Sequence, residues 1–494
     1  MQKTQPALNW ASYITVNIYF LGLSTLAQTM APLVLPLLVQ RFVGQAQQGT
    51  FVGILRLWGL MVALLAQAFW GMLSDRSKLR WGRRRPFILG GTLVDQVFIA
   101  AIAFSAGLSG MSGYWWLFAM YLLLQVSSNA AQGAQQGLIP DLVPENKRGL
   151  FSGIKAIFEV PLPVILVAFT VARLISAGNM WGGILVATGV LVVCMILTMF
   201  AREEPLLKPS ALREAWQPFL RLVLMTALFT AIILGMGEMV KLSGNWMQEA
   251  ASTGSQFIIM GLAGLVAMSI AVALGVWISV RISVGETARD AERSSFTWWV
   301  VNRLAFLVGA FNLSTFAVFF LQARLGLIKE AAAKPAATLM LFVGVFVLLF
   351  ALISGWLADR RLASHKRLVA IAGFVAALGT LIAILSPSLT FIYVGGCFIG
   401  AATGLFYTAN WALGTELVPK AEAGRYLGIS NLAGAGAGAV GAYIGGPIAD
   451  YFTVHAPNVP GLGYVLLFAI YGMLFLLSVV ALVRVKEPNA VAQP

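Results

Sequence analysis

The sequence predicts an all-α polytopic membrane protein, built as two pseudo-symmetric six-helix bundles plus two inserted central helices, with about 14 transmembrane helices in all. Three observations lead to this fold class: the composition, the apolar runs and an internal repeat. Of the 494 residues, 59% are hydrophobic and 11% are charged, and the mean hydropathy is +0.85. Soluble domains contain about 25% charged residues. A chain this apolar could not hide its surface in a water-soluble core.

The apolar runs are long enough to cross a bilayer, for which a helix needs about 20 residues. The first six lie near residues 14–40, 51–74, 86–107, 114–138, 150–176 and 181–201. Two further runs follow a polar linker, near 218–237 and 256–283. The last six lie near 297–322, 335–357, 368–386, 390–413, 425–448 and 462–484.

These runs divide the chain into three parts: an N-terminal six-helix bundle (1–201), a linker with two extra transmembrane helices (202–296), and a C-terminal six-helix bundle with a short tail (297–494). Because the insertion contains an even number of helices, both bundles keep the same orientation in the membrane.

Two internal repeats support a duplication of one membrane unit. The segment Gly71–Arg76 recurs as Gly355–Arg360, each with the pattern Gly-x-Leu-x-Asp-Arg. The segment Asp141–Gly153 aligns without a gap on Glu416–Gly428. A duplicated membrane unit indicates a transporter.

The net charge of +14 is explained by topology. Basic residues gather in loops that the positive-inside rule assigns to the cytoplasm, so both termini are predicted to be cytoplasmic and the protein to lie in the cell (inner or plasma) membrane. No soluble part is left to bind nucleic acid. Cys194 and Cys397 fall inside apolar runs and are predicted to pack there, without a disulfide or a metal.

The basic loop between the second and third runs resembles a known signature. Gly71–Arg76 followed by Gly82-Arg83-Arg84 resembles the signature loop of the major facilitator superfamily. The longer form, which ends in Arg85-Pro86-Phe87, is similar to the glycoside–cation symporter branch that includes plant-type sucrose transporters. Three further positions fit that branch: Gln67, Gln132-Gly133 and Asp141-Leu142. The superfamily resemblance covers nearly the whole chain, and the branch resemblance rests mainly on the first four helices.

The chain departs from the branch at two positions of the fourth helix. The proton-coupling aspartate of the branch pattern is Gln125 here, and its arginine is Gln136. Neither glutamine titrates, so the resemblance does not carry the branch's route of sucrose–proton symport to this chain.

The resemblance implies a cytoplasmic gate. Each repeat carries an aspartate, Asp75 or Asp359, that would dock against the start of a helix in the opposite half, near Gly424 and Gly149 respectively. A carboxylate at a helix N-terminus gains about 0.3–1 kcal/mol. The alternative is that the charges only set topology. The predicted gate residues are Gly71, Asp75, Arg76, Gly82, Arg83, Arg84, Asp359 and Arg360.

A predicted substrate cavity follows from the polar fourth helix, because unpaired amides in hydrocarbon cost several kcal/mol each. Its amides recur at spacings of three and four and so share a face, and the repeat adds aromatic and amide groups opposite. Such groups suit polyhydroxylated solutes. The alternative is hydrogen bonding between helices. The predicted cavity residues are Gln67, Gln125, Asn129, Gln132, Gln136, Tyr407, Asn410 and Trp411.

Charged residues inside the spans are functional candidates. Glu159, with Lys155 four residues earlier on the same helical face, is the predicted proton carrier, and a self-neutralising packing pair is the alternative. Asp95 is predicted to be structural. Arg303 is predicted to snorkel to the cytoplasm, with a substrate role as the alternative.

The sequence therefore predicts a secondary active transporter of a small solute, most readily a sugar or glycoside, with proton or cation symport. The alternatives are an exporter or facilitator of a more apolar compound, and a non-transporting pigment or assembly carrier. No catalytic constellation, metal site or cofactor motif occurs in the sequence, so an enzyme is not predicted. The predicted partners are the lipid bilayer, the solute and a proton or cation, and the protein is expected to be a monomer.

Overall fold

The computed structural model describes residues 10–144, 147–201, 203, 212–247, 252–284, 290–359, 364–385, 388–418 and 423–486. Within these residues the regular elements are all helices. Thirteen helical stretches there are long and apolar enough to cross a membrane. Helix α6 (Gly110–Gln136), with 27 residues, is also long enough but is rich in amides. Thirteen plus α6 gives fourteen spans, which confirms the predicted fold class.

Contacts divide the chain into two compact units. Unit 1 comprises residues 1–34 and 62–220, and unit 2 comprises residues 35–61 and 221–494. Residues 35–61 lie in the predicted N-terminal bundle but make their contacts within unit 2. The predicted domain boundaries at 201/202 and 296/297 describe the duplication in sequence and stay a prediction.

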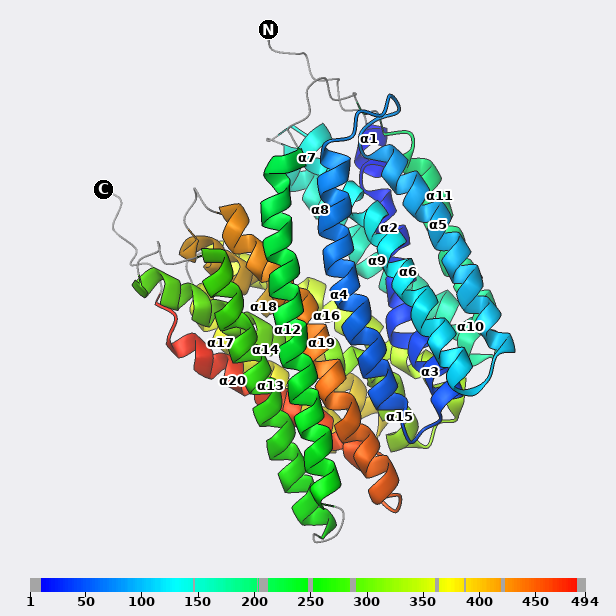
Figure 1. Cartoon of the computed structure of the whole chain (residues 1–494), viewed down its shortest axis with the longest axis vertical. Coiled ribbons are helices and arrows are strands. Elements are labelled where there is room, and N and C mark those ends of the chain that lie inside the picture. The colour runs from blue at the N-terminus through cyan, green and yellow to red at the C-terminus, as the bar shows by residue number, and fades with distance from the viewer. Residues whose placement is uncertain are drawn as a thin grey trace. The chain divides into compact units, whose positions relative to one another are not determined.

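Unit 1 contains the helices of the first repeat, and α5 and α6 lie side by side in it (Figure 1). Its helices, with the part of α4 from Val62 onward, are α1 (Trp10–Thr15), α2 (Ile18–Thr29), α4 (Gln48–Asp75), α5 (Arg85–Phe104), α6, α7 (Leu138–Leu142), α8 (Arg148–Glu159), α9 (Pro161–Leu166), α10 (Ala172–Ser176) and α11 (Met180–Thr198). Short π-helical turns occur at Met30–Val34 and Val167–Val171, and a 3-10 turn at Ser105–Gly107.

Two spans of the first repeat are broken, and proline explains both breaks. Pro32 lies in the π-helical turn that follows α2, and Pro161 starts α9 directly after α8 has ended at Glu159. Proline has no N–H to donate and its ring collides with the preceding turn, so the helix must stop or bend. The fifth span is therefore bent next to its carboxylate, while backbone hydrogen bonds from Val160 N–H to Ala156 O and from Val164 N–H to Val160 O continue across the bend.

Unit 2 contains the second repeat and most of the insertion. Its helices, with α4 up to Met61 and α12 from Arg221, are α3 (Leu35–Val43), α12 (Leu212–Met247), α13 (Thr253–Val284), α14 (Asp290–Thr315), α15 (Ala317–Leu325), α16 (Ala333–Asp359), α17 (His365–Leu385), α18 (Leu389–Leu417), α19 (Ala423–His455) and α20 (Leu462–Val483). A 3-10 turn, Lys329–Ala332, precedes α16.

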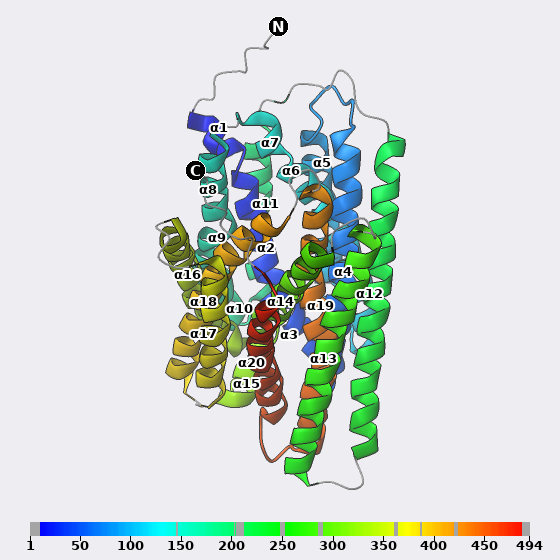
Figure 2. The same cartoon turned by 90° about the vertical axis from the view of Figure 1, so that its left-hand side faces the viewer.

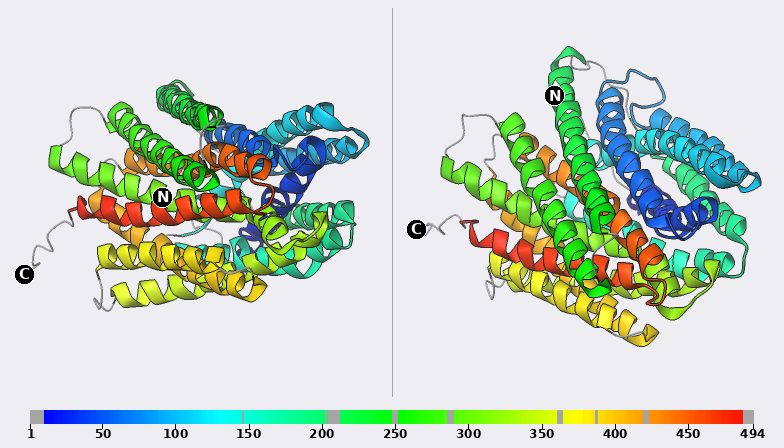
Figure 3. Two further views of the ribbon diagram at one scale, coloured as in Figure 1. Left: turned by 90° about the horizontal axis from the view of Figure 1, so that it is seen from below. Right: turned by 60° about the horizontal axis from the view of Figure 1, so that its bottom comes forward.

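Small residues bring the helices of unit 2 close together. α17 and α18 run side by side and α16 packs on α18 (Figures 2 and 3). A Cβ added at Gly379 on α17 would lie 2.8 Å from the carbonyl oxygen of Gly395 on α18. Glycine is therefore required at this crossing, as expected where membrane helices associate by close backbone packing.

The inserted helices α12 and α13 are long, with 36 and 32 residues. α13 packs against α14, α19 and α20. α12 contacts α19 through Tyr443, whose hydroxyl donates to Glu238 Oε1 over 3.0 Å. The insertion is thus part of the packing of unit 2.

Candidate functional site

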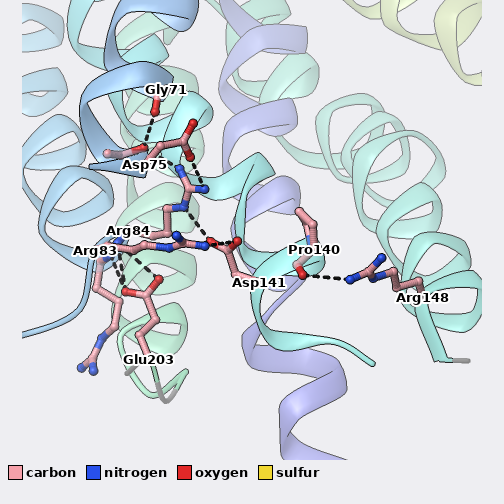
Figure 4. Close-up of polar contacts among 10 residues, drawn as sticks. Gly71, Asp75, Arg83, Arg84, Pro140, Asp141, Arg148 and Glu203 are labelled. Atoms are coloured by element: carbon pink, nitrogen blue, oxygen red, sulfur yellow. Dashed lines mark hydrogen bonds and ion pairs between the residues drawn. The ribbon is translucent and has the colours of Figure 1, made fainter. Parts of the chain in front are cut away.

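The basic loop is folded around the buried side chain of Arg84, which is 5% exposed (Figure 4). The guanidinium forms an ion pair with Asp75 at the end of α4. Its Nε donates to Asp141 Oδ2 over 2.9 Å, and its Nη1 donates to Ser74 Oγ over 2.7 Å. A Cβ at Gly137 would collide with this guanidinium, so a residue without a side chain is needed there. One arginine thus joins α4, α5 and α7.

Asp141 on α7 also forms an ion pair with a second arginine. Arg83 Nε donates to Asp141 Oδ2 over 3.0 Å, and a further ion pair joins the same two side chains. Arg148, at the start of α8, donates to the carbonyl oxygen of Pro140 over 3.1 Å. The segment after α6 is therefore fastened to the basic loop on one side and to α8 on the other.

A third carboxylate, Glu203, accepts hydrogen bonds from the N-terminus of α5. The backbone N–H groups of Arg84 and Arg85 donate to Glu203 Oε2 over 3.0 and 3.1 Å. A carboxylate in this position satisfies amides that have no partner within the helix. Burial nevertheless raises the pKa of Glu203, because desolvation outweighs these hydrogen bonds and the charge of Arg84. Gly82, with φ +111°, makes the turn that lets the loop pass this carboxylate.

The structure brings several predicted gate residues together. Asp75, Arg83 and Arg84 share one network. Gly71 accepts a hydrogen bond from Ser74, and Arg76 Nη1 donates to the carbonyl oxygen of Met72.

The equivalent residues of the second repeat are less completely described. Arg360 and the side chain of Asp359 lie outside the described residues. Docking of either aspartate on the opposite half stays a prediction.

The second repeat carries a matching pair in unit 2. Glu416, which the repeat aligns with Asp141, accepts at Oε1 from the ring nitrogen Nδ1 of His365 at 2.9 Å. Thus an acidic residue pairs with a basic residue of the signature loop in both repeats: Asp141 on α7, just after α6, and Glu416 in the last turn of α18. The sequence analysis did not assign a role to Asp141, Glu203 or Glu416. The repeat alignment of Asp141 with Glu416 was the available signal for two of them.

The amides of α6 divide into two groups. Gln135 is fully buried and donates to the carbonyl oxygen of Val16 over 2.7 Å, so it joins helices. Asn129 is buried and donates to the backbone oxygen of Gln125 within its own helix. Gln132 is half-buried and Gln136 is exposed. Gln67 on α4 is half-buried, and its backbone oxygen would lie 2.9 Å from a Cβ at Gly133.

Arg303 on α14 forms the main polar cluster of the second repeat. Its Nη1 donates to Asn410 Oδ1 over 2.9 Å. Its guanidinium carbon lies 5.9 Å from the ring centre of Trp299 and 5.5 Å from that of Trp411. Asn410 is fully buried and donates to Asn302 Oδ1 over 2.9 Å. The amide predicted to line the cavity therefore orients the arginine between two indole rings.

The cluster combines a cation with an accessible aromatic surface. Trp411 is 42% exposed, and Tyr407, one turn earlier, interacts electrostatically with Arg303. Among the described residues no carboxylate is paired with Arg303. A charged group inside a membrane span without a counter-ion is a functional candidate. Planar donors beside an indole face can bind hydroxyl groups and cover the apolar face of a sugar ring.

Lys155 and Glu159 form the predicted pair on α8. Lys155 Nζ lies 3.7 Å from Glu159 Oε2 and 4.5 Å from the ring centre of Phe20. Glu159 is the last residue of α8, directly before the break at Pro161. An ionisable residue inside a membrane span is a functional candidate. The coupling role of the pair stays a prediction.

Asp95 is fully buried and accepts a hydrogen bond from Ser127. Nearby, the hydroxyl groups of Tyr19 and Thr92 lie 2.6 Å apart. In the described part of the chain, no group of three or more His, Cys, Asp or Glu side chains could hold a metal ion.

Comparison with known proteins gives a family match over most of the chain. Residues 18–328 and 304–494 match the sequence model of the family described as the Major Facilitator Superfamily.

Similar curated proteins include sucrose transporters. The sucrose transport protein SUC3 of Arabidopsis thaliana is 24% identical over 208 residues, which are 33% of this chain and 33% of that protein. The sucrose transport protein SUT1 of Oryza sativa subsp. japonica is 28% identical over 190 residues, 32% of this chain and 35% of that protein. An uncharacterized symporter, sll1374, of Synechocystis sp. is 28% identical over 193 residues, 35% of this chain and 34% of that protein. The chain thus spans about a third of the length of the relatives it matches.

Solved structures share the fold over nearly the full length. A crystal structure of the peptide transporter POT in complex with sulfate has a TM-score of 0.66 at 14% identity, covering 98% of each chain. A crystal structure of the nucleoside transporter NupG has a TM-score of 0.60 at 12% identity, covering 96% of this chain and 100% of that chain. At these identities the likeness concerns the fold alone.

Proposed function

The chain belongs to the major facilitator superfamily, and we propose that within it the protein carries a sugar or glycoside across the cell membrane by alternating access, in symport with a proton or cation. As a member of this family it is a multi-pass membrane transporter and not an enzyme. The partial matches to sucrose transport proteins support the choice of substrate class.

The observation that carries the substrate proposal is the placement of Arg303 between Trp299 and Trp411. The guanidinium carbon lies within 6 Å of both ring centres, and Nη1 donates to Asn410 Oδ1. Nε is buried and has no hydrogen-bond partner among the described residues, and hydroxyl oxygens are good acceptors for such donors. The exposed face of Trp411 supplies the apolar contact that a pyranose ring can use.

For coupling, we assign the titrating role to Glu159. The neutral Gln125 and Gln136 cannot change charge, whereas Glu159 lies at a helix break beside Lys155. Proton uptake by Glu159 would free Lys155 from its partner, so one protonation would change two interactions. We place the basic loop and both termini in the cytoplasm, and we take the functional protein to be a monomer.

A second candidate function is export or facilitated movement of a more apolar compound. It is favoured by the loss of titratable groups at Gln125 and Gln136. In that case Trp411 and Tyr407 would bind an aromatic or apolar solute, and no pH gradient would be needed.

Uptake by purified protein in proteoliposomes tests these functions. With an inside-alkaline pH gradient, we expect labelled sucrose or methyl β-glucoside to accumulate, and a protonophore to abolish accumulation. Dye efflux that is independent of sugar would instead identify an exporter. Folded protein that moves no solute would contradict both transport proposals and favour an assembly role.

Two variants connect uptake with the site. Arg303→Gln and Trp411→Ala should each raise KM about tenfold, because one stacking or charge-assisted contact contributes about 1–1.5 kcal/mol. The matched control is Trp277→Ala on α13, since Trp277 also lies beside an arginine, 5.2 Å from the guanidinium carbon of Arg281. Unchanged KM in the site variants, or an equal change in the control, would remove Arg303 and Trp411 from the site.

A further inference from the structure

Asp450, near the end of α19, accepts hydrogen bonds from the first turn of α4. The backbone N–H of Gly49 donates to Asp450 Oδ1 over 2.8 Å, and the backbone N–H of Thr50 donates to Oδ2 over 2.7 Å. The carboxyl group is buried. About 400 residues separate the partners in sequence. The carboxylate therefore satisfies amides at a helix N-terminus, where the helix dipole also favours a negative charge.

No residue near the start of α4 offers the usual local cap. The four residues before the helix are Gly44-Gln45-Ala46-Gln47, which contain none of the preferred capping types Ser, Thr, Asp and Asn. The N–H groups at the N-terminal end of α4 thus depend on a side chain from α19 for their hydrogen bonds. This arrangement can be released and remade, because water can bind the same N–H groups when the carboxylate withdraws.

Amide side chains add further hydrogen bonds around the contact between Asp450 and the start of α4. Gln48 Nε2 donates to the hydroxyl of Tyr464 on α20 over 2.8 Å and its Oε1 accepts from Gln40 Nε2 over 2.7 Å. Gln40 and Gln322 exchange hydrogen bonds of 2.9 and 3.2 Å. These amides come from α3, α4 and α15, and Gln48 and Gln322 are buried.

The backbones of α4 and α19 also touch. A Cβ added at Gly49 would lie 2.7 Å from the carbonyl oxygen of Gly446, and one at Gly53 would lie 3.0 Å from Cα of Tyr443. Glycine at these positions allows the two helices to meet without side chains between them. A side chain larger than glycine at Gly49 or Gly53 would therefore disturb this contact.

We propose that Asp450 is the positioning residue that holds the end of the transporter opposite to the basic loop closed. Residues 35–61 are held in unit 2 by these contacts, while the chain continues from them into unit 1 at both ends. Opening at this end requires the segment to leave α19, which separates Asp450 from Gly49 and Thr50. The latch consists of Asp450 with Gln40, Gln48, Gln322 and Tyr464. It rests on the proposed alternating access.

Distances between spin labels test the latch without any substrate. Labels go on cysteines at Ala46 and Val459, two exposed loop positions next to the latch, in a background where Cys194 and Cys397 are replaced by alanine. The protein is studied in nanodiscs by double electron–electron resonance. In Asp450→Asn an amide N–H₂ replaces one acceptor oxygen, so we expect the ratio of long to short distances to rise about tenfold.

Glu238→Gln is the matched control. It removes another carboxylate that contacts α19, through Tyr443, and not the carboxylate that accepts from Gly49 and Thr50, so the label distances should stay as in the unsubstituted protein. Gly446→Ala is the second variant, for use if Asp450→Asn does not fold. Its Cβ would collide with the backbone of Gly49, and it should lengthen the same distance.

The proposal is overturned if both Asp450→Asn and Gly446→Ala fold and keep the short distance, or if Glu238→Gln lengthens it equally. Failure of the proposed sugar transport gives a different result, because the labels then still report opening while the unsubstituted protein accumulates no sugar. Net uptake should fall in Asp450→Asn while binding of sugar, measured by tryptophan fluorescence, is retained. Loss of both in a correctly folded variant would assign Asp450 a merely structural role.

Discussion

Arg84 is the residue on which the order of the basic loop depends most. Its guanidinium is buried and contacts Asp75, Asp141 and Ser74. In the variant Arg84→Gln, Asp75 would lose its ion-pair partner and Ser74 its donor, while Asp141 would keep only Arg83. Removing one partner of a buried ion pair costs about 3–5 kcal/mol. The half-exposed Asp75 places the expected loss in unfolding free energy near the lower figure.

The measurement is the thermal unfolding midpoint of the purified protein. Arg80→Gln serves as control, because it removes the same charge from an exposed position of the same loop. The midpoint should fall in Arg84→Gln and stay unchanged in Arg80→Gln. Equal changes in the two variants would attribute the effect to net charge and not to the network.

Glu159 offers a second prediction at the scale of single residues. Glu159→Gln should abolish accumulation of sugar driven by a pH gradient, because the amide cannot take up a proton. It should leave sugar exchange across the membrane at equal sugar concentrations, since exchange needs no net proton movement. In proteoliposomes, uptake measures the accumulation driven by the pH gradient, and counterflow measures the exchange of sugar. Gradient-driven accumulation at the unsubstituted rate in Glu159→Gln would rule out the carrier role.

At the scale of helices, the free backbone N–H groups at the N-termini of α5 and α4 are satisfied in the same way. Each is closed by a carboxylate from a distant part of the chain, Glu203 for α5 and Asp450 for α4. The family resemblance implied a carboxylate at a helix N-terminus for Asp75 and Asp359, each at a helix start in the opposite half. It could not identify Glu203 and Asp450, because capping across the fold leaves no local pattern in the sequence.

The pH dependence of stability follows from the partly buried Glu203. Burial raises its pKa above the ordinary 4.5. At pH values between the ordinary and the raised pKa, the folded state therefore binds more protons than the unfolded state. The unfolding free energy then decreases as the pH rises. The contribution is fully present below about pH 4.5 and is lost as the pH passes the raised pKa.

The side chain of the variant Glu203→Gln does not titrate, so the variant does not lose this contribution as the pH rises. The unfolding midpoint of the variant minus that of the unsubstituted protein should therefore increase with pH. Thermal unfolding between about pH 4.5 and 8 measures this difference. Glu330→Gln, which removes a carboxylate elsewhere, should show no such trend. A difference that is constant with pH in Glu203→Gln would mean that this carboxyl titrates alike in both states.

The positions of the membrane-spanning helices could be predicted, because they depend on the local composition of the sequence. Runs of membrane length predicted the spans, and α6 was among them as the run near 114–138, although it is not one of the thirteen stretches that are apolar enough to cross a membrane. The partners of individual side chains were not predictable. The role of Asn410 as a cavity residue stays a prediction, whereas its buried position and its hydrogen bond with Arg303 could not be foreseen from the sequence. Repeat alignment places a residue on an element but does not reveal which neighbours satisfy its polar groups.

For the whole molecule, the duplication has a consequence for topology. The Asp141 and Glu416 positions both pair with a basic residue of their own signature loop, as expected of two copies of one unit. The sequence predicts that both copies have the same orientation in the membrane. Two inserted helices preserve that orientation, whereas one or three would invert the second repeat. The charge of the basic loop predicts that the loop lies in the cytoplasm.

Labelling of single cysteines in intact cells tests this arrangement. A membrane-impermeant maleimide should react with cysteines at Ser109, Ser252 and Val459, which lie at exposed ends of the first repeat, the insertion and the second repeat. It should react with a cysteine at Leu79, in the basic loop, only after the membrane is permeabilised. Labelling at Ser109 but not at Val459 would show an odd number of inserted spans. The two signature loops would then face opposite sides, and a paired cytoplasmic gate would be impossible.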